Sequence, residues 1–266
     1  MLRDITLGQY YPADSLLHKL DPRVKLFGTM IYIISLFLFD NLWGILWITL
    51  SLVAVIRMSK VPFSFMVRGL RSIVILLLVA GVFNLFLTPG EKLASFWILT
   101  ITKEGVKNAT LMTIRMVYLI IGTSIMTLTT TPNQLTDGLE KSLHGLTKLN
   151  VPVHEIAMMM SIALRFIPIL IEETDKIMKA QMARGADFES GNIFQKAKNM
   201  VPLLVPLFVS AFRRAYDLAQ AMEARCYHGG EGRTKMKPLQ YVSRDRNAYL
   251  LILAFFVVVI VLKVVF

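Results

Sequence analysis

The sequence predicts an all-α membrane protein with about five transmembrane helices and long amphipathic helices on the cytoplasmic side of the membrane. Of its 266 residues, 55% are hydrophobic, and the mean hydropathy is +0.58. Both values exceed those of ordinary soluble domains, and the apolar residues gather in runs instead of spreading evenly. The single cysteine, Cys226, excludes an internal disulfide and any multi-cysteine metal site.

Five apolar runs predict the transmembrane helices. They are Leu26–Phe39, Leu42–Ile56, Ile73–Leu87, Ala109–Leu128 and Tyr249–Phe266. A spanning helix needs about 20 mostly apolar residues, so the first two runs are short for this role. We expect four of these helices in an N-terminal membrane domain, residues 1–130, and the fifth in a C-terminal segment, residues 247–266.

Basic residues in the loops predict how these helices are oriented. Arg3, Lys19, Arg23 and Lys25 precede the first run, and Arg57, Lys60, Arg68 and Arg71 lie between the second and the third. The loop between the first two runs has no Lys or Arg. Because basic residues concentrate on the cytoplasmic side, we expect a multi-pass protein of the cell membrane with a cytoplasmic N-terminus.

No nucleic-acid partner is expected, since the net charge of +11 comes without a basic module of interleaved aromatic residues.

Residues 131–246 hold most of the charge and are predicted to form a cytoplasmic domain. A short amphipathic helix is expected from Pro132 to His144, a long helix from Pro152 to Gly185, and a second long helix from Asn192 to near Cys226. At about 1.5 Å per residue, each long helix would measure about 45 to 50 Å.

Each long helix changes from apolar to polar along its length. The first long helix contains the stretch Ile156–Ile171, which is apolar except for Arg165. The second contains the apolar stretch Met200–Phe212. Both parts are short of a span and contain prolines, so we expect helices that pack at the membrane surface; the alternative is two more spanning helices. If the two helices cross, acidic residues of the first can pair with basic residues of the second: Glu172, Glu173 and Asp175 with Arg213 and Arg214.

An Ala-Arg step ends both long helices. "KAQMARGADF" contains Arg184, and "AQAMEARCYH" contains Arg225, 41 positions later. One interpretation is structural, because an Arg in the last turn complements the helix dipole and Gly185 is an ordinary residue at a helix end. The second copy weakens that interpretation, since Arg225 is followed by Cys226 and not by glycine.

Three ordered motifs carry a resemblance to a known family. The stretches "GQYYPADSLLHKLDPRVKL", "ALRFIPILIEETDKIMKAQMARGADF" and "AMEARCYHGG" resemble the transmembrane T component of energy-coupling factor (ECF) transporters, which import vitamins and metals. The resemblance implies two partners: a pair of cytoplasmic ABC-type ATPases, which bind the ATP and Mg²⁺, and a small substrate-binding membrane protein, the S component. It also implies that residues 131–246 are a coupling domain, whose ATPase-docking residues are Ala183, Arg184, Gly185, Ala224, Arg225 and Cys226.

Two further sets of residues are candidates for contacts. The methionine run Met158, Met159 and Met160 is predicted to contact the S component, because methionine adapts to different surfaces; packing in the core or against lipid is the alternative. The set Asp21, Pro22, Arg23 and Lys25 is predicted to be a membrane anchor motif. Asp21 before Pro22 is typical of a helix N-cap, and the basic pair would then anchor the first span on the cytoplasmic side; a direct contact with a partner is the alternative.

Enzyme functions find little support in the sequence. It lacks a Gly-x4-Gly-Lys-Ser/Thr loop, so the chain is not expected to bind ATP itself, and its histidines lack ligand spacing, so no metal site is expected. Glu172, Glu173 and Asp175 suggest one alternative, a membrane-embedded magnesium-dependent enzyme similar to prenyltransferases. That alternative needs a second acidic cluster on a partner helix, where this chain has Arg213 and Arg214.

Overall fold

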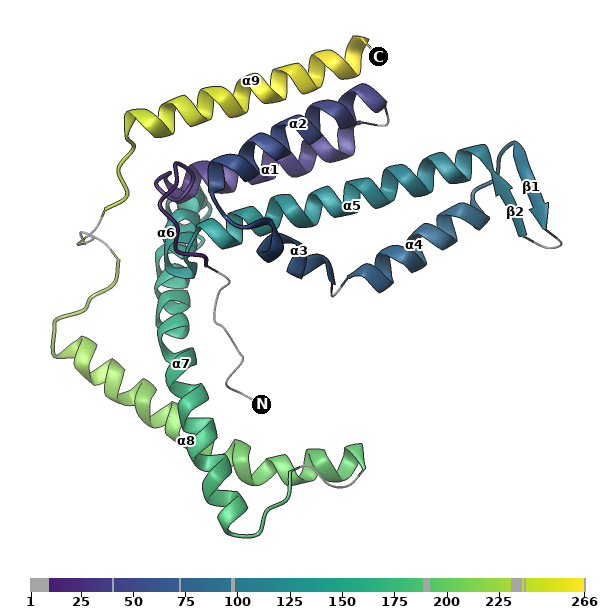
Figure 1. Cartoon of the computed structure of the whole chain (residues 1–266). Helices are drawn as coiled ribbons and strands as arrows, with labels where there is room; N and C mark the ends of the chain where they lie inside the picture. The colour runs from purple at the N-terminus through teal and green to yellow at the C-terminus, as the bar shows by residue number, and fades with distance from the viewer. Residues whose placement is uncertain are drawn as a thin grey trace. The chain divides into compact units, whose positions relative to one another are not determined.

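The computed structural model describes residues 10–39, 41–71, 73–96, 99–188, 192–230, 236 and 238–265. The chain divides into two compact units (Figure 1). The bundle unit comprises residues 8–139 and 239–266, and the long-helix unit comprises residues 1–7 and 140–238. The predicted domain limits after residues 130 and 246 concern membrane topology and stay a prediction.

The bundle unit is almost entirely helical. Its elements are α1 (Pro22–Leu38), α2 (Leu42–Ser59), α3 (Phe63–Arg71), α4 (Val74–Leu87), β1 (Lys92–Phe96), β2 (Leu99–Thr102), α5 (Lys103–Thr129), most of α6 (Pro132–Leu143) and α9 (Ser243–Val265). The long-helix unit contains the 3-10 helix η2 (His144–Leu149), α7 (Val153–Ala183) and α8 (Ile193–Glu223). Each of the five predicted apolar runs coincides with a helix except at its end residues, and the prediction of an all-α membrane protein is confirmed.

Helix α5 is the centre of the bundle unit and packs against α1, α2, α3 and α4, while α9 packs against α1 and α2 (Figure 1). Gly122 on α5 makes one close approach possible, because a Cβ there would overlap the ring of Tyr32 from α1. The hydroxyl of Tyr32 donates to the carbonyl of Tyr118 at 3.0 Å, and the hydroxyls of Tyr118 and Thr49 are 2.7 Å apart. These three polar side chains between the helices are thus paired, as an apolar surrounding favours.

Three of the described helices are long and apolar enough to cross a membrane, namely α5, α7 and α9. Two shorter apolar helices, Trp43–Ser59 and Val74–Leu87, fall within the predicted membrane domain. The inclusion of α7 keeps open the alternative of further spanning helices, so the number of crossings stays a prediction.

A β-hairpin departs from the helical expectation. Strands β1 and β2 pair antiparallel after α4, with Phe96 opposite Leu99 and Lys92 opposite Thr102. The second strand, Leu-Thr-Ile-Thr, is rich in β-branched residues, which favour extended backbone. The last residue of this strand, Thr102, is also the N-cap of α5, because its hydroxyl accepts the N–H of Gly105 at 3.0 Å.

Candidate functional site

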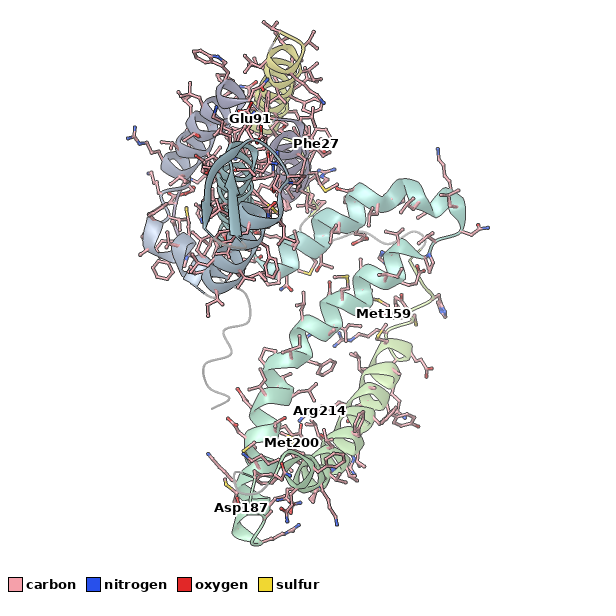
Figure 2. All side chains as sticks on the ribbon, turned by 90° about the vertical axis from the view of Figure 1, so that its right-hand side faces the viewer. Phe27, Glu91, Met159, Asp187, Met200 and Arg214 are labelled. Atoms are coloured by element: carbon pink, nitrogen blue, oxygen red, sulfur yellow. The ribbon has the colours of Figure 1, made fainter. Side chains whose placement is uncertain are left out.

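The two long helices run antiparallel and are joined by side-chain contacts. Arg214 lies on α8 (Figure 2). Its guanidinium donates to the Glu173 carboxylate of α7, at 2.6 Å from Nη2 and 3.0 Å from Nε. Ser210 donates to the other carboxylate oxygen of Glu173. Nearer the end of α7, the Gln181 side chain donates to the carbonyl of Pro202 at 3.2 Å. The predicted pairing of acidic and basic residues is therefore found for Glu173 and Arg214.

The first predicted docking segment, Ala183–Gly185, forms the end of α7, and we call it the first tip. The N–H groups of Arg184 and Ala186 both donate to the carbonyl of Gln181, each at 3.0 Å, and that of Gly185 donates to Met182 at 3.0 Å. Gly185 has a φ of +90°. This is the Schellman helix ending, in which one residue in the left-handed conformation reverses the chain.

The second predicted docking segment, Ala224–Cys226, ends α8 in the same way, and we call it the second tip. Arg225 and Tyr227 donate to the carbonyl of Met222 at 3.1 and 3.0 Å, and Cys226 donates to Glu223 at 2.9 Å. Cys226 has a φ of +55°. The backbone hydrogen bonds of the first tip are thus repeated 41 positions later, although cysteine replaces glycine at the left-handed position.

All six residues of the two tips are exposed. Among the described residues, neither Arg184 nor Arg225 forms an ion pair. Because the helices are antiparallel, the tips lie at opposite ends of the pair: the second tip shares a groove of about 520 Å³ with Met158 and Ile162 of α7. From Ile162 to Arg184, α7 rises about 33 Å, which sets the approximate spacing of the two tips.

The methionine run is divided between two environments. Met158 lines the groove beside the second tip. Met159 and Met160 are 57% and 43% exposed and belong to the surface of the long-helix unit. Their predicted contact with an S component stays a prediction.

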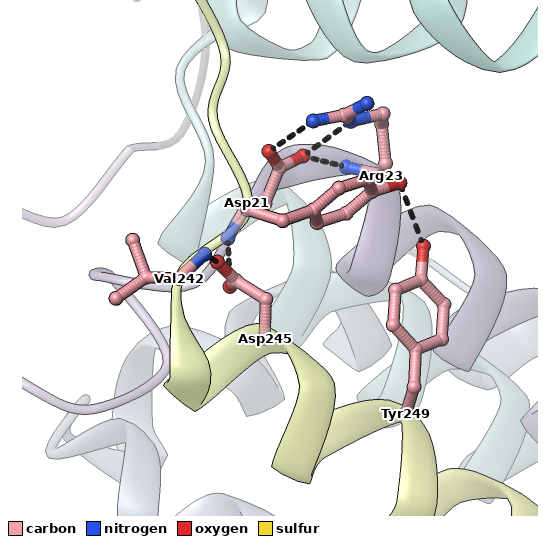
Figure 3. A network of polar contacts seen from close by, with 6 residues as sticks. Asp21, Arg23, Val242, Asp245 and Tyr249 are labelled. Carbon is pink, nitrogen blue, oxygen red and sulfur yellow. Dashed lines mark hydrogen bonds and ion pairs between the residues drawn. The ribbon is translucent and has the colours of Figure 1, made fainter.

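The predicted anchor motif lies at the start of α1, where Asp21 is the N-cap and Pro22 the first helical residue. The Asp21 carboxylate accepts the backbone N–H of Arg23 at 2.9 Å and also binds its guanidinium (Figure 3). That guanidinium lies 3.7 Å from the ring centroid of Tyr241, next to α9. Lys25 is buried, and its ammonium donates to the carbonyl of Thr129 at 2.8 Å. Both basic side chains therefore contact the bundle unit itself, and their role at the membrane surface stays a prediction.

Sequence analysis missed one member of this network. The carboxylate of Asp245, at the start of α9, accepts the backbone N–H of Asp21 at 2.9 Å and that of Val242 at 2.8 Å (Figure 3). Asp21 and Asp245 are 224 positions apart, so no local pattern relates them. The acidic residue near the first turn of an apolar helix was the available signal.

Within the described ranges, no group of three or more His, Cys, Asp or Glu side chains is placed to hold a metal ion. Glu173, a member of the acidic cluster considered for magnesium, is engaged by Arg214 and Ser210. What the long-helix unit presents instead is a pair of matched, exposed arginine tips.

Fold and tips together define a helical membrane subunit, and comparison with known proteins gives its class. Residues 13–236 match the family described as cobalt transport protein, CbiQ. Similar proteins occur in Clostridium kluyveri, 56% identical over 247 residues and 92% of each chain, and in Ruminiclostridium cellulolyticum, 50% identical over the full length of both chains. A third, in Bacillus subtilis, is 46% identical over 248 residues, covering 93% of this chain and 94% of its own.

Each of these relatives is named energy-coupling factor transporter transmembrane protein EcfT. The chain belongs to this family, the transmembrane T components of ECF transporters. The resemblance seen in the three sequence motifs is confirmed. The chain is therefore a membrane component of a transporter that works in a complex with other proteins.

Proposed function

We propose that this chain is the scaffold and coupling subunit of an ATP-driven importer of vitamins or other micronutrients. Its first and second tips each dock on one of two cytoplasmic ATPase subunits, which bind ATP and Mg²⁺. The helix pair α7–α8 transmits the movement of the ATPases to an S component, which binds the substrate in the membrane. The N-terminus of the chain lies in the cytoplasm.

The observation that carries this proposal is the repeated helix ending. Two 31-residue helices end in the same backbone turn, each with an arginine at the turn and a small alanine before it. A guanidinium offers several directed donors to carboxylates and carbonyls, which suits a contact that must transmit force. Two such tips, about 33 Å apart, suit two similar partner subunits.

The surface of α7 favours a position at the membrane interface over a transmembrane one. Ser161, Arg165, Pro168, Glu172 and Lys176 are all exposed and follow one another at intervals of three or four residues, so they lie on one stripe of the helix. Three of them are charged, and charged side chains in contact with lipid tails are costly. A helix with such a stripe is better placed with its polar side in water, where both tips can reach cytoplasmic partners.

Charge reversal at both tips tests the proposal. Arg184→Glu with Arg225→Glu should abolish recovery of the ATPases in a pull-down of the tagged chain, and substrate uptake into vesicles should be lost. Removing one partner of a buried charged pair typically costs about 2 to 5 kcal/mol of binding free energy, and here two contacts are reversed. The matched control is Arg213→Glu, which changes an exposed arginine on α8 outside the tips. This variant should keep both the recovery of the ATPases and the uptake of substrate.

The stability of the isolated chain separates the two interpretations of the arginines. Exposed substitutions usually change stability by less than about 0.5 kcal/mol, so the double variant should unfold in detergent at the parent temperature. A double variant that keeps its ATPases but loses stability would show that the arginines only stabilise helix ends. A single variant should lose less binding than the double, because the other tip still holds the ATPase pair.

A further inference from the structure

Pro206 in α8 leaves the backbone carbonyl of Pro202 without its usual partner. In an α-helix, the carbonyl of residue 202 accepts the N–H of residue 206. Residue 206 is Pro206, which has no N–H, and α8 nevertheless continues through both Pro202 and Pro206. The carbonyl of Pro202 is therefore free to accept a donor from outside α8.

The donor comes from the end of α7. The side-chain amide of Gln181 reaches the Pro202 carbonyl at 3.2 Å. The backbone carbonyl of the same Gln181 accepts the N–H groups of Arg184 and Ala186, the bonds that form the first tip. One residue thus shapes the first tip with its backbone and joins it to α8 with its side chain.

We propose that Gln181 is a positioning residue, which fixes the first tip to α8 through the carbonyl that Pro206 leaves free. This inference rests on the proposed coupling function. It assigns to the proline pair a role in passing movement from the first tip into α8, and so toward the second tip. The bond between Gln181 and Pro202 lies about one helical turn from Arg184, so a small shift of the first tip is expected to change the length of this bond.

The distance between the two tips measures this role directly in the purified chain. Cys226 is native, exposed and at the second tip, so one added cysteine, Met182→Cys, allows spin labels at both tips. Three changes are made in that background: Gln181→Leu, which removes the donor; Pro206→Ala, which gives Pro202 a donor within α8; and the two together. Gln220→Leu removes a similar exposed amide from α8 near the second tip and is the control.

The expected result is a narrow distance distribution in the parent and in the Gln220→Leu control. Gln181→Leu should broaden the distribution, and Pro206→Ala should broaden it and shift its mean, because α8 also straightens without Pro206. The double variant should match Pro206→Ala alone, since both changes remove the same bond. In the assembled transporter, Gln181→Leu and Pro206→Ala should lower the amount of substrate imported per ATP hydrolysed while the ATPases remain bound.

Two outcomes would overturn the inference. One is a Gln181→Leu distribution as narrow as that of the control, and the other is a double variant whose broadening is the sum of the two single effects. Pro206→Ala also separates positioning from mere stabilisation, because removing a proline from a helix favours the helix. A variant that is at least as stable as the parent but imports less per ATP cannot be explained by loss of fold. Failure of tip docking would be seen in the charge-reversal pull-down, whereas failure of this inference would be seen in the isolated chain.

Discussion

Exchanging the residues at the turning positions of the two tips tests whether the tips are built alike. Cys226 and Gly185 both have positive φ values, +55° and +90°. Glycine adopts this region freely, whereas the Cβ of any other residue crowds the following carbonyl at a cost of about 1 to 2 kcal/mol. Cys226→Gly should therefore stabilise the second tip, and Gly185→Cys should destabilise the first.

The size of the effect follows from the local surroundings. Apart from its two chain neighbours, no described residue has an atom within 4 Å of a Cβ placed on Gly185, so a cysteine there adds backbone strain without a clash among these residues. A glycine also makes the unfolded chain more flexible, which offsets about 0.4 to 1 kcal/mol of the gain or loss. The net change is about 0.5 to 1 kcal/mol in each direction, equivalent to roughly a two- to fivefold change in the opening of the helix end.

Amide hydrogen exchange of the detergent-solubilised chain measures this local opening. Tyr227 and Ala186 donate the longest-range bond of each tip, so their amides report on it. We expect slower exchange of Tyr227 in Cys226→Gly and faster exchange of Ala186 in Gly185→Cys. Gly145→Ala, at an open position of η2, is the control and should change neither amide. Faster exchange of Tyr227 in Cys226→Gly would refute the assignment of a matching left-handed turn to the second tip.

Two other predictions concern the bundle unit and the membrane topology. Gly122→Ala should destabilise the chain in detergent by about 1 to 3 kcal/mol, because the added methyl overlaps the Tyr32 ring, whereas Gly69→Ala, with its nearest neighbour at 3.6 Å, should be tolerated. Equal melting temperatures for the two variants would contradict the close packing of α1 on α5. For topology, Cys226→Gly provides a cysteine-free chain, in which single cysteines at Lys60 and Gly191 should react only from the cytoplasm and one at Lys92 only from outside. External labelling at Gly191 would instead make the long helices transmembrane.

Local features of this fold were predictable from the sequence because they depend on neighbouring residues. The N-cap at Asp21, with Pro22 after it, is a matter of two adjacent residues. The ends of α7 and α8 were expected at Gly185 and near Cys226, and both helices end within three residues of those positions. The ion pair between Glu173 and Arg214 was also predictable, since each residue follows an apolar stretch of similar length.

The features that were missed depend on contacts between distant parts of the chain. Asp245 binds the backbone of Asp21 across 224 positions. The prolines of α8 were read as evidence against a membrane span, but nothing in the sequence predicted that a side chain from α7 supplies one missing donor. Cysteine at a left-handed position was not expected either, because its intrinsic preference opposes that conformation and the repeated turn overrides it.

The network at the start of α1 has a consequence for how the protein is made. A ribosome completes α1 long before α9, and until α9 exists, the backbone N–H of Asp21 lacks the carboxylate of Asp245. The apolar cluster of Leu36, Phe39 and Ile48 likewise lacks Val259 until then. The bundle therefore cannot close during insertion of its first helices. Completion of the bundle waits for α9, so a message truncated before α9 would yield a protein that lacks the contacts of Asp245 and Val259.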